Sequence, residues 1–351
     1  MTPDIRPPTR KRPSLLRRLR PAVVGLLLLA LAFYGYVRYQ LAPVDANGRA
    51  TEFEVQPGWG GNRVAAELAR AGLVRNGRVF SLYLRYNDFD RAIGEGLYDL
   101  SPAMSVPQLA TALAEGGRAR STLVVLPEGL RLVEVAGRLA EAGFGEERAL
   151  LETMQTPGEL RPAYISEDAT LEGYLFPEGY SFPVNSSATE IVRTMLGHFE
   201  EVLGTYADTL ADQGLAISDW VTLASMVQAE AANAVEMPIV AGVFLNRLEE
   251  GMRLQSDPTA AYGVGKTLPQ LVADDLDQDT PWNTYTRNGL PQTPINNPGR
   301  EALQAVLEPI QVNEQGERYL YFLHGVDEGQ PVFRPNTNLE AHNQDVQRYL
   351  R

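Results

Sequence analysis

The sequence of 351 residues contains no cysteine. Disulfide bonds, iron–sulfur clusters and zinc sites built on thiolates are therefore excluded. A protein without such crosslinks depends on its packed core, and this chain is long enough to form two or three domains. Hydrophobic residues make up 44% and charged residues 21% of the sequence, which is typical of a globular protein.

Histidine is also scarce. The three histidines, His198, His324 and His342, lie far apart, and no HExxH or similar pairing is present. This spacing favours surface or structural roles, so we predict no metal site. His324 and His342 lie among polar residues near the C-terminus and stay candidates for a functional site. The sequence also lacks a GxSxG elbow, a Walker A loop and a GxGxxG turn after a strand, and no cofactor is predicted.

The charge is divided unevenly along the chain. The net charge is −13, but residues 1–40 hold eight basic residues and one acidic residue. The remaining residues therefore carry a net charge of −20. A body this acidic argues against nucleic acid as a partner, because phosphate binding requires clustered Lys and Arg side chains.

Residues 21–37 form a run of 17 residues without a charge. This is the short end of the length that spans a membrane, and flanking Tyr and Arg side chains can extend it by snorkelling. Seven of the eight basic residues precede the run, so the N-terminus is predicted to be cytoplasmic and residues 39–351 to lie outside. We therefore predict a disordered cytoplasmic tail at 1–20, a transmembrane helix at 21–38 and a linker at 39–50.

Two other interpretations of the apolar run exist. A cleavable signal peptide would use Ala30–Leu31–Ala32 as its small-residue cleavage site. However, Tyr34, Tyr36 and Tyr39 are typical of an aromatic belt at the outer interface and favour an uncleaved anchor. A buried core helix fits badly with the dense basic cluster before the run. The prediction is a single-pass protein of the cell membrane.

A weak internal repeat follows the linker. Residues 53–73 and 124–144 share seven identical residues at an offset of 71, among them Gly58/Gly129 and Gly72/Gly143. Each copy predicts a short strand, a Pro/Gly turn, an amphipathic helix and a glycine stop.

Residues 94–117 predict a further strand, turn and helix, with Ser105 as the N-cap and Pro107 in the first turn. The stretch 55–117 is therefore predicted as strand–helix–loop–strand–helix. Such an α+β module is either glycan-binding or a plain structural scaffold.

From residue 160 onward, loops rich in Pro, Gly, Asn and Tyr alternate with helices. Amphipathic or apolar patterns predict helices at 189–210, 219–232 and 237–249. The last of these is apolar on most sides and should be buried. Its exception is Asn246, which requires a hydrogen-bond partner if it is buried.

The helix predicted at 219–232 carries a carboxylate in an awkward place. Leu223, Val227 and Glu230 follow at i, i+4 and i+7, so they share one helix face. Burial of a carboxylate usually raises its pKa, and a carboxyl group protonated near neutral pH can act as a general acid in cleaving sugar bonds. The alternative is a solvated charge near a helix end.

Three further segments, 171–183, 246–263 and 281–299, hold more polar residues than loops require. Aromatic faces beside carboxyl and hydroxyl groups suit sugar rings, although each segment alone could be an ordinary turn-rich loop. Their candidate side chains are Glu172 and Tyr174 in the first, Asn246, Gln255, Ser256, Asp257 and Tyr262 in the second, and Asn283, Thr284 and Tyr285 in the third.

At these segments the sequence resembles a known family. LEGYLFPEGYSFP, ASMVQAEAAN, VAGVFLNRLEEGMRLQSDPTAAYG, PWNTYTRNGLPQTPINNPG and YLYFLHG closely resemble the endolytic murein transglycosylases, the YceG-like or MltG family, in order and spacing. The resemblance covers roughly residues 45–351. It implies an α+β protein with a single N-terminal transmembrane helix, a LysM-like β–α module at 51–120 and a mixed α+β catalytic domain at 121–351.

The resemblance also implies an activity. Members of this family cut peptidoglycan glycan strands internally, between MurNAc and GlcNAc, and leave 1,6-anhydro-MurNAc ends. The matching position makes Glu230 the catalytic residue. Many members have a second acid two residues earlier. This chain has Gln228 at that position, so a role for a second acid on that turn is in doubt. The ten polar candidates named above would orient the sugar or stabilise charge.

The family further implies association with peptidoglycan synthases and a role in terminating or trimming new strands. The alternative function is a non-catalytic, glycan-binding scaffold of the cell envelope, in which Glu230 is only structural. A peptidase has little support, because a catalytic cysteine, a zinc-binding histidine cluster and a serine elbow are all absent.

Overall fold

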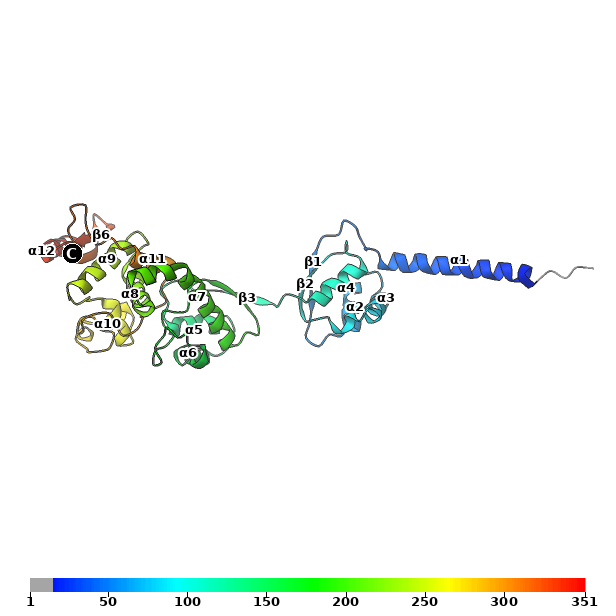
Figure 1. The fold of residues 1–351 in the computed structure, drawn as a ribbon, viewed down its shortest axis with the longest axis horizontal. Coiled ribbons are helices and arrows are strands. Elements are labelled where there is room, and N and C mark those ends of the chain that lie inside the picture. The colour runs from blue at the N-terminus through cyan, green and yellow to red at the C-terminus, as the bar shows by residue number, and fades with distance from the viewer. Residues whose placement is uncertain (1–14, 351) are drawn as a thin grey trace, which may run out of the picture. The chain divides into compact units, whose positions relative to one another are not determined.

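The computed structural model describes residues 15–350, with side chains described from residue 23 onward. Residues 1–14 of the predicted tail lie outside this range. The chain divides into two compact units, the first ending at Arg120 and the second beginning at Ser121 (Figure 1). Together they contain helices and antiparallel strand pairs, so the α+β prediction is confirmed.

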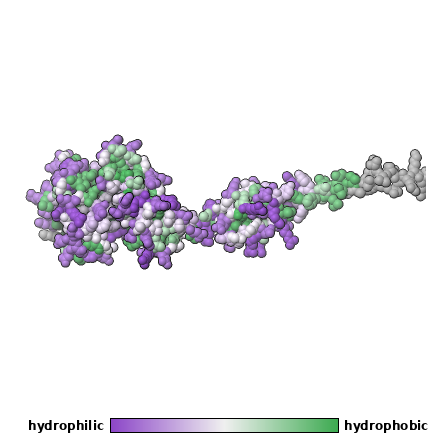
Figure 2. All heavy atoms as spheres, turned by 60° about the horizontal axis from the view of Figure 1, so that its bottom comes forward, coloured by the Kyte–Doolittle hydropathy of each residue, from purple (hydrophilic) through white to green (hydrophobic). Residues whose placement is uncertain are grey.

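Helix α1 (Leu15–Leu41) opens the first unit. Its stretch Val23–Leu41 is long and apolar enough to cross a membrane, and none of it is buried in the protein. Figure 2 shows the hydrophobic surface of this helix. The helix is longer than the predicted span at both ends. Residues 15–20 of the predicted tail are helical rather than disordered, as are the first three residues of the predicted linker.

The C-terminal end of α1 is held by Arg75. Its guanidinium donates to the carbonyl oxygens of Ala42 and Pro43, each at 2.6 Å, and more weakly to those of Tyr39 and Val44. The guanidinium also lies 4.5 Å from the centre of the Tyr39 ring. The last carbonyls of a helix have no intrahelical partner, and here one side chain satisfies that of Tyr39 together with three carbonyls just after the helix.

The rest of the first unit is a small α+β module. Strand β1 (Thr51–Val55) pairs antiparallel with β2 (Gly96–Leu100), with Phe53 opposite Tyr98. Three helices cover the pair: α2 (Gly61–Arg70), α3 (Gly77–Tyr86) and α4 (Val106–Glu115). A short 3-10 turn, η1 (Phe89–Arg91), follows α3.

Two predictions from the sequence can be compared with the structure of this module. The helix cap is confirmed, because Ser105 caps α4 in a capping box with Gln108. The predicted loop between the first helix and second strand is wrong, because α3 lies there. Asn76 caps α3 by accepting from the backbone N–H groups of Arg78 and Val79, and Phe80 and Leu84 are fully buried.

The second unit contains two strand pairs and eight α-helices among its described residues. The pairs are β3 (Ser121–Val125) with β4 (Gly179–Pro183), and β5 (Tyr321–Asp327) with β6 (Gln330–Asn336). The helices are α5 (Leu132–Glu141), α6 (Glu147–Gln155), α7 (Ala188–Gln213), α8 (Ile217–Glu230), α9 (Met237–Glu249), α10 (Asp257–Gly263), α11 (Arg300–Leu307) and α12 (Leu339–Tyr349), with α10 only two turns long.

The predicted repeat is confirmed as local structure. The first copy forms β1 and α2, and the second copy forms β3 and α5. Each helix is followed by a glycine with positive φ, Gly72 at +73° and Gly143 at +91°, which is the backbone conformation of a helix stop. The three predicted helices after residue 160 correspond to α7, α8 and α9.

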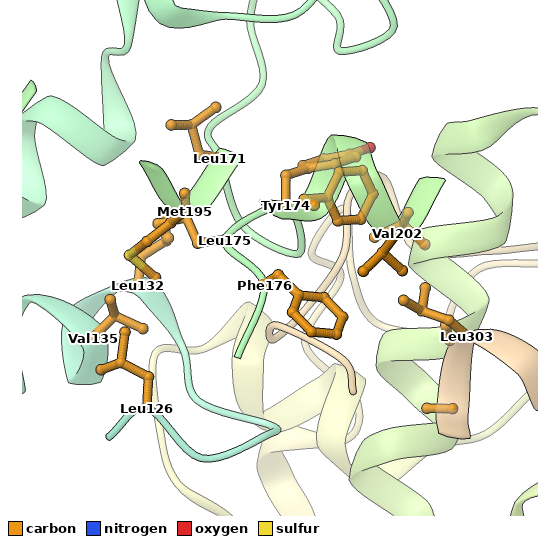
Figure 3. Packing of buried hydrophobic residues seen from close by; sticks show 14 of the residues in the cluster. Leu126, Leu132, Val135, Leu171, Tyr174, Leu175, Phe176, Met195, Val202 and Leu303 are labelled. Carbon is orange, nitrogen blue, oxygen red and sulfur yellow. The ribbon is translucent and has the colours of Figure 1, made fainter. Parts of the chain in front are cut away.

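The core of the second unit gathers around the loop from Leu171 to Phe176 (Figure 3). Helix α8 is anchored within it, because the buried Trp220 donates from its indole N–H to the carbonyl oxygen of Leu303 at 2.8 Å. Helix α9 approaches segment 310–311 so closely that a Cβ at Gly242 would lie 2.1 Å from the Ile310 oxygen. These contacts fix α8, which carries Glu230, and the next helix, α9.

Candidate active site

Glu230 is the last residue of α8, and the helix ends two residues earlier than predicted. Ala231 adopts an extended backbone, with φ −76° and ψ 134°, and this stops the helix. Leu223 and Val227, two turns and one turn before Glu230, are buried in the core. The same helix face therefore runs from the core to the carboxyl group of Glu230, as its spacing predicts.

The Glu230 carboxyl group makes one strong contact. The Ser256 hydroxyl donates to Oε1 at 2.6 Å, while Oε2 has no hydrogen-bond donor within residues 23–350. Burial raises the pKa of Glu230 to about 7, against the lowering effect of the Ser256 hydrogen bond and with the help of the Asp257 carboxylate. Glu230 is therefore able to hold a proton near neutral pH and to release it.

Ser256 is positioned by a buried hydroxyl network. Its backbone N–H donates to Thr284 Oγ1 at 3.0 Å, and the Thr284 and Thr259 hydroxyls lie 2.8 Å apart. Thr259 in turn donates to the Ser256 carbonyl oxygen at 2.6 Å. The residue before Ser256, Gln255, has φ +52°, a left-handed conformation that costs energy for a residue other than glycine. Such strain is common at functional sites.

Glu230 opens onto a cavity of about 420 Å³, a volume typical of sites for small molecules. Its walls come from α8, α9, the turn before α10, β5, α12 and the segment around residue 285. The lining residues are Glu230, Phe244, Arg247, Leu254, Gln255, Asp257, Tyr285, Tyr321, Phe322, Leu339, His342 and Asn343.

A second carboxylate lies in the cavity wall. Asp257 accepts a hydrogen bond from the Tyr285 hydroxyl at 2.6 Å. Burial and this hydrogen bond both raise the pKa of Tyr285, so its proton stays in place. Arg253 donates to the Tyr285 carbonyl oxygen at 2.8 Å and holds the segment in position.

The turn after α8 is held by Glu236. Its carboxylate accepts from the backbone N–H of Ala232 at 3.0 Å and from the Asn233 amide at 2.8 Å, and a 2.8 Å hydrogen bond joins it to His324 Nε2 in β5. Burial alone would raise the pKa of Glu236, but these hydrogen bonds outweigh burial and lower it. The end of α8 is therefore tied to β5.

A separate buried carboxyl group, Glu172, lies outside the cavity wall. It is 3% exposed and accepts from the Leu132 N–H at 3.1 Å, the Tyr262 hydroxyl at 3.2 Å and the Asn297 amide at 3.4 Å. Burial raises the pKa of Glu172 to about 8. Arg131 stacks over the Tyr262 ring at 5.2 Å. This cluster, Glu172 with its three donors, connects α5, α10 and the loop before α11.

Comparison with known proteins identifies the family of this chain. The model of the YceG-like family matches residues 53–348. The chain belongs to the YceG-like family. The resemblance found in the sequence is therefore confirmed.

Two relatives of this chain are named for an enzymatic activity. Proteins named endolytic murein transglycosylase from Streptococcus pneumoniae and Bacillus subtilis are 30% and 27% identical to this chain, each over 92% of it. The chain spans 63% of the length of the Streptococcus pneumoniae relative and 91% of the Bacillus subtilis one. A crystal structure of a putative YceG-like protein from Listeria monocytogenes is 30% identical, with a TM-score of 0.56, over 85% of this chain and 99% of that one.

The YceG-like site gathers part of the predicted set. Gln255, Asp257 and Tyr285 line the cavity beside Glu230. Ser256 contacts Glu230 directly, and Thr284 supports Ser256 from behind.

The other predicted candidates lie away from the cavity wall. The buried Asn246 donates to the carbonyl oxygens of Gln311 and Tyr319, so its predicted need for a partner is confirmed. Asn283 donates to the carbonyls of Leu276 and Gln278. Tyr174 packs edge-on against Phe199 in the core, and Glu172 and Tyr262 belong to the separate cluster.

Several residues of the cavity wall were not predicted from the sequence. Phe244, Arg247, Leu254, Tyr321, Phe322, Leu339 and Asn343 were not singled out, although His342 was a candidate. Arg247 offered a signal, because it is a charged residue within the mostly apolar α9. No local pattern shows that residues of β5 and α12 line the cavity with Glu230, because only tertiary packing brings them there.

Proposed function

We propose that this protein is a peptidoglycan lytic transglycosylase, and that Glu230 is its acid–base residue. The observation that carries the proposal is the Glu230 carboxyl group at the cavity wall, with one oxygen held by Ser256, the other free, and a pKa of about 7. The names of the relatives support the same reaction.

The reaction requires one carboxyl group in two protonation states. Protonated Glu230 donates its proton to the glycosidic oxygen between MurNAc and GlcNAc as the C1–O bond breaks. The resulting carboxylate then accepts the proton of the MurNAc 6-hydroxyl while that oxygen bonds to C1. The products are a free GlcNAc 4-hydroxyl and a 1,6-anhydro-MurNAc end, so Glu230 regains its proton and no water is consumed. Ordinary glycosidases divide these tasks between two carboxyl groups.

The cavity supplies the remaining parts of this mechanism. Asp257 keeps a negative charge near Glu230, which favours both the protonated acid and the positive charge that develops on the sugar. Gln255 and Tyr285 are placed to bind the sugar. Ser256 and Thr284 position the acid, while Asn246, Asn283, Glu172, Tyr174 and Tyr262 maintain the backbone around it.

The proposal extends to the cell envelope. Helix α1 would anchor the protein in the cell membrane with its basic N-terminus inside and residues 39–351 outside, where peptidoglycan lies. Residues 51–120 would form a LysM-like module and residues 121–351 the catalytic domain. Cleavage within strands would terminate or trim new glycan, in association with peptidoglycan synthases.

The test uses the full chain in detergent, as wild type and Glu230→Gln, incubated with purified peptidoglycan. Mass spectrometry counts 1,6-anhydro-MurNAc ends. Removal of a general acid–base group costs about 10²- to 10⁴-fold, so Glu230→Gln should yield almost none. Glu249→Gln, an exposed glutamate on α9, is the control and should cleave like wild type.

Two results would contradict this proposal. Equal numbers of anhydro ends from wild type and Glu230→Gln would move catalysis to another residue. No ends from folded wild type would favour the glycan-binding scaffold.

A further inference from the structure

Arg247 places a positive charge in the wall of the Glu230 cavity. Its side chain is only 8% exposed, yet it lines the same 420 Å³ space as Glu230. Its Nε donates to the Leu320 carbonyl oxygen at 2.6 Å, and its Nη1 donates to that of Leu254 at 2.8 Å. The guanidinium also lies 5.1 Å from the centre of the Tyr321 ring. Three neighbours therefore fix its plane.

The guanidinium is not fully satisfied by the protein. Across residues 23–350, no carboxylate forms an ion pair with Arg247, and Nη2 has no acceptor. A buried charge is costly unless it is paired and hydrogen-bonded, and carbonyl dipoles alone compensate it poorly. Arginine also cannot lose its proton at ordinary pH, so it does not serve as the acid.

We propose that Nη2 of Arg247 donates to a carbonyl-type oxygen on an acyl substituent of the sugar bound beside Glu230. This inference rests on the proposed function, in which the substrate is a strand of acetylated amino sugars that carry lactyl groups. Two groups share the required chemistry, the acetamido carbonyl and the lactyl carboxyl. Because the guanidinium is held rigidly, this contact would set which ring lies at the acid, and so where the strand is cut.

The experiment measures binding, so that it does not depend on turnover. The full chain carrying Glu230→Gln is titrated in detergent with three peptide-free glycan strands of equal length. One is unmodified, one is N-deacetylated, and in one the lactyl carboxyl group is reduced to an alcohol. A hydrogen bond to a charged donor is worth about 10- to 100-fold in affinity, so one modified strand should bind that much more weakly.

The same titrations with Glu230→Gln/Arg247→Met decide the assignment. This variant should bind the unmodified strand as weakly as the modified strand that lacks the group recognised by Arg247. It should lose discrimination against that modified strand and not against the other. The strand whose discrimination disappears identifies the group that Arg247 binds. Arg318→Met is the matched control, because Arg318 is half-exposed, pairs with Glu249 and Glu250, and lies outside the cavity wall. It should keep the discrimination.

Clear results would overturn the inference. Equal binding of all three strands to the Glu230→Gln protein would do so without any change at Arg247, and therefore even if Arg247→Met failed to fold. Unchanged discrimination in the folded Arg247→Met variant would do so as well. Failure of wild type to make anhydro ends would instead count against the proposed function, and the binding result would still stand.

Discussion

Glu230 and Glu172 are two buried carboxyl groups in one compact unit, and burial raises the pKa of both, to about 7 and about 8. They differ in what surrounds their oxygens. Glu230 receives one hydrogen bond, from Ser256, and faces a cavity. Both oxygens of Glu172 receive hydrogen bonds from the protein, from Leu132 on one side and Tyr262 on the other.

This difference separates a reactive group from a structural one. A raised pKa by itself marks both residues, and would direct attention to Glu172 first. The oxygen that the protein leaves free is the better guide, because only a free oxygen can transfer a proton to a ligand. Glu172 instead joins three segments that are far apart in the sequence.

The largest expected contrast is in activity. Glu172→Gln should cleave peptidoglycan at a rate of the wild-type order, whereas Glu230→Gln should lose about 10²- to 10⁴-fold. The number of anhydro ends formed per minute, at a temperature where both variants are folded, measures it. A folded Glu172→Gln as inactive as Glu230→Gln would place Glu172 in the reaction.

The next contrast is in stability. Asn297 accepts from the buried N–H groups of Gly173 and Leu175 at 3.1 and 3.0 Å, and Asn297→Ala would leave both unsatisfied. We expect the free energy of unfolding to fall by about 2–6 kcal/mol. Gln255→Gly, at the strained turn beside Glu230, should change it by about 1 kcal/mol or less. Urea denaturation measures both, and comparable losses would erase the distinction.

A further effect appears in the pH dependence of stability. The folded pKa of Glu172 is about 8, above the unfolded value of about 4.3, so above pH 4.3 the unfolded state binds fewer protons. Stability is therefore fully present below about pH 4.3 and is lost as pH rises towards 8, by up to about 1.4 kcal/mol per unit.

Urea titrations between pH 5 and 8 measure this slope. They are made in the Glu230→Gln background, which removes the similar contribution of Glu230. Adding Glu172→Gln should flatten the slope. A slope that persists would show that another group titrates.

The smallest expected effect concerns Ser256. Its hydrogen bond lowers the pKa of Glu230, so Ser256→Ala should raise that pKa and move the basic limb of the rate–pH profile to higher pH. The midpoint of the limb is the measured quantity, because the height also reflects lost positioning of the acid. An unmoved midpoint would mean that the limb belongs to a different group. Thr286→Ala, which removes a half-buried hydroxyl that donates to Asp279 and to the Asn283 carbonyl oxygen, is the control.

Much of the fold follows from local patterns. The repeated β–α unit, the Ser105 cap and helices α7 to α9 were predictable because period and capping residues act over a few positions. Helix α3 was missed, although Asn76 as a cap and the buried pair Phe80 and Leu84 at i and i+4 indicate it.

The site was only partly predictable for a related reason. Glu230 and the loop at 255–257 stand out because polar residues there interrupt apolar patterns. Arg247 could have been noticed in the same way. Tyr321 and His342 reach the cavity only through the packing of β5 and α12. No local sequence pattern shows that these two elements lie beside Glu230. Glu172 and Tyr262 were predicted near the sugar because composition cannot show which polar residues are fully enclosed.

The Arg75 contacts at the end of α1 also limit how far the α+β module of the first unit can lie from this apolar helix. Nine residues, 42–50, separate α1 from β1, and a free segment of that length could stretch roughly 30 Å. Arg75 holds the first residues of this segment against the module, so the segment cannot extend to its full length. If α1 spans a membrane, as proposed, the module is then held close to the lipid surface.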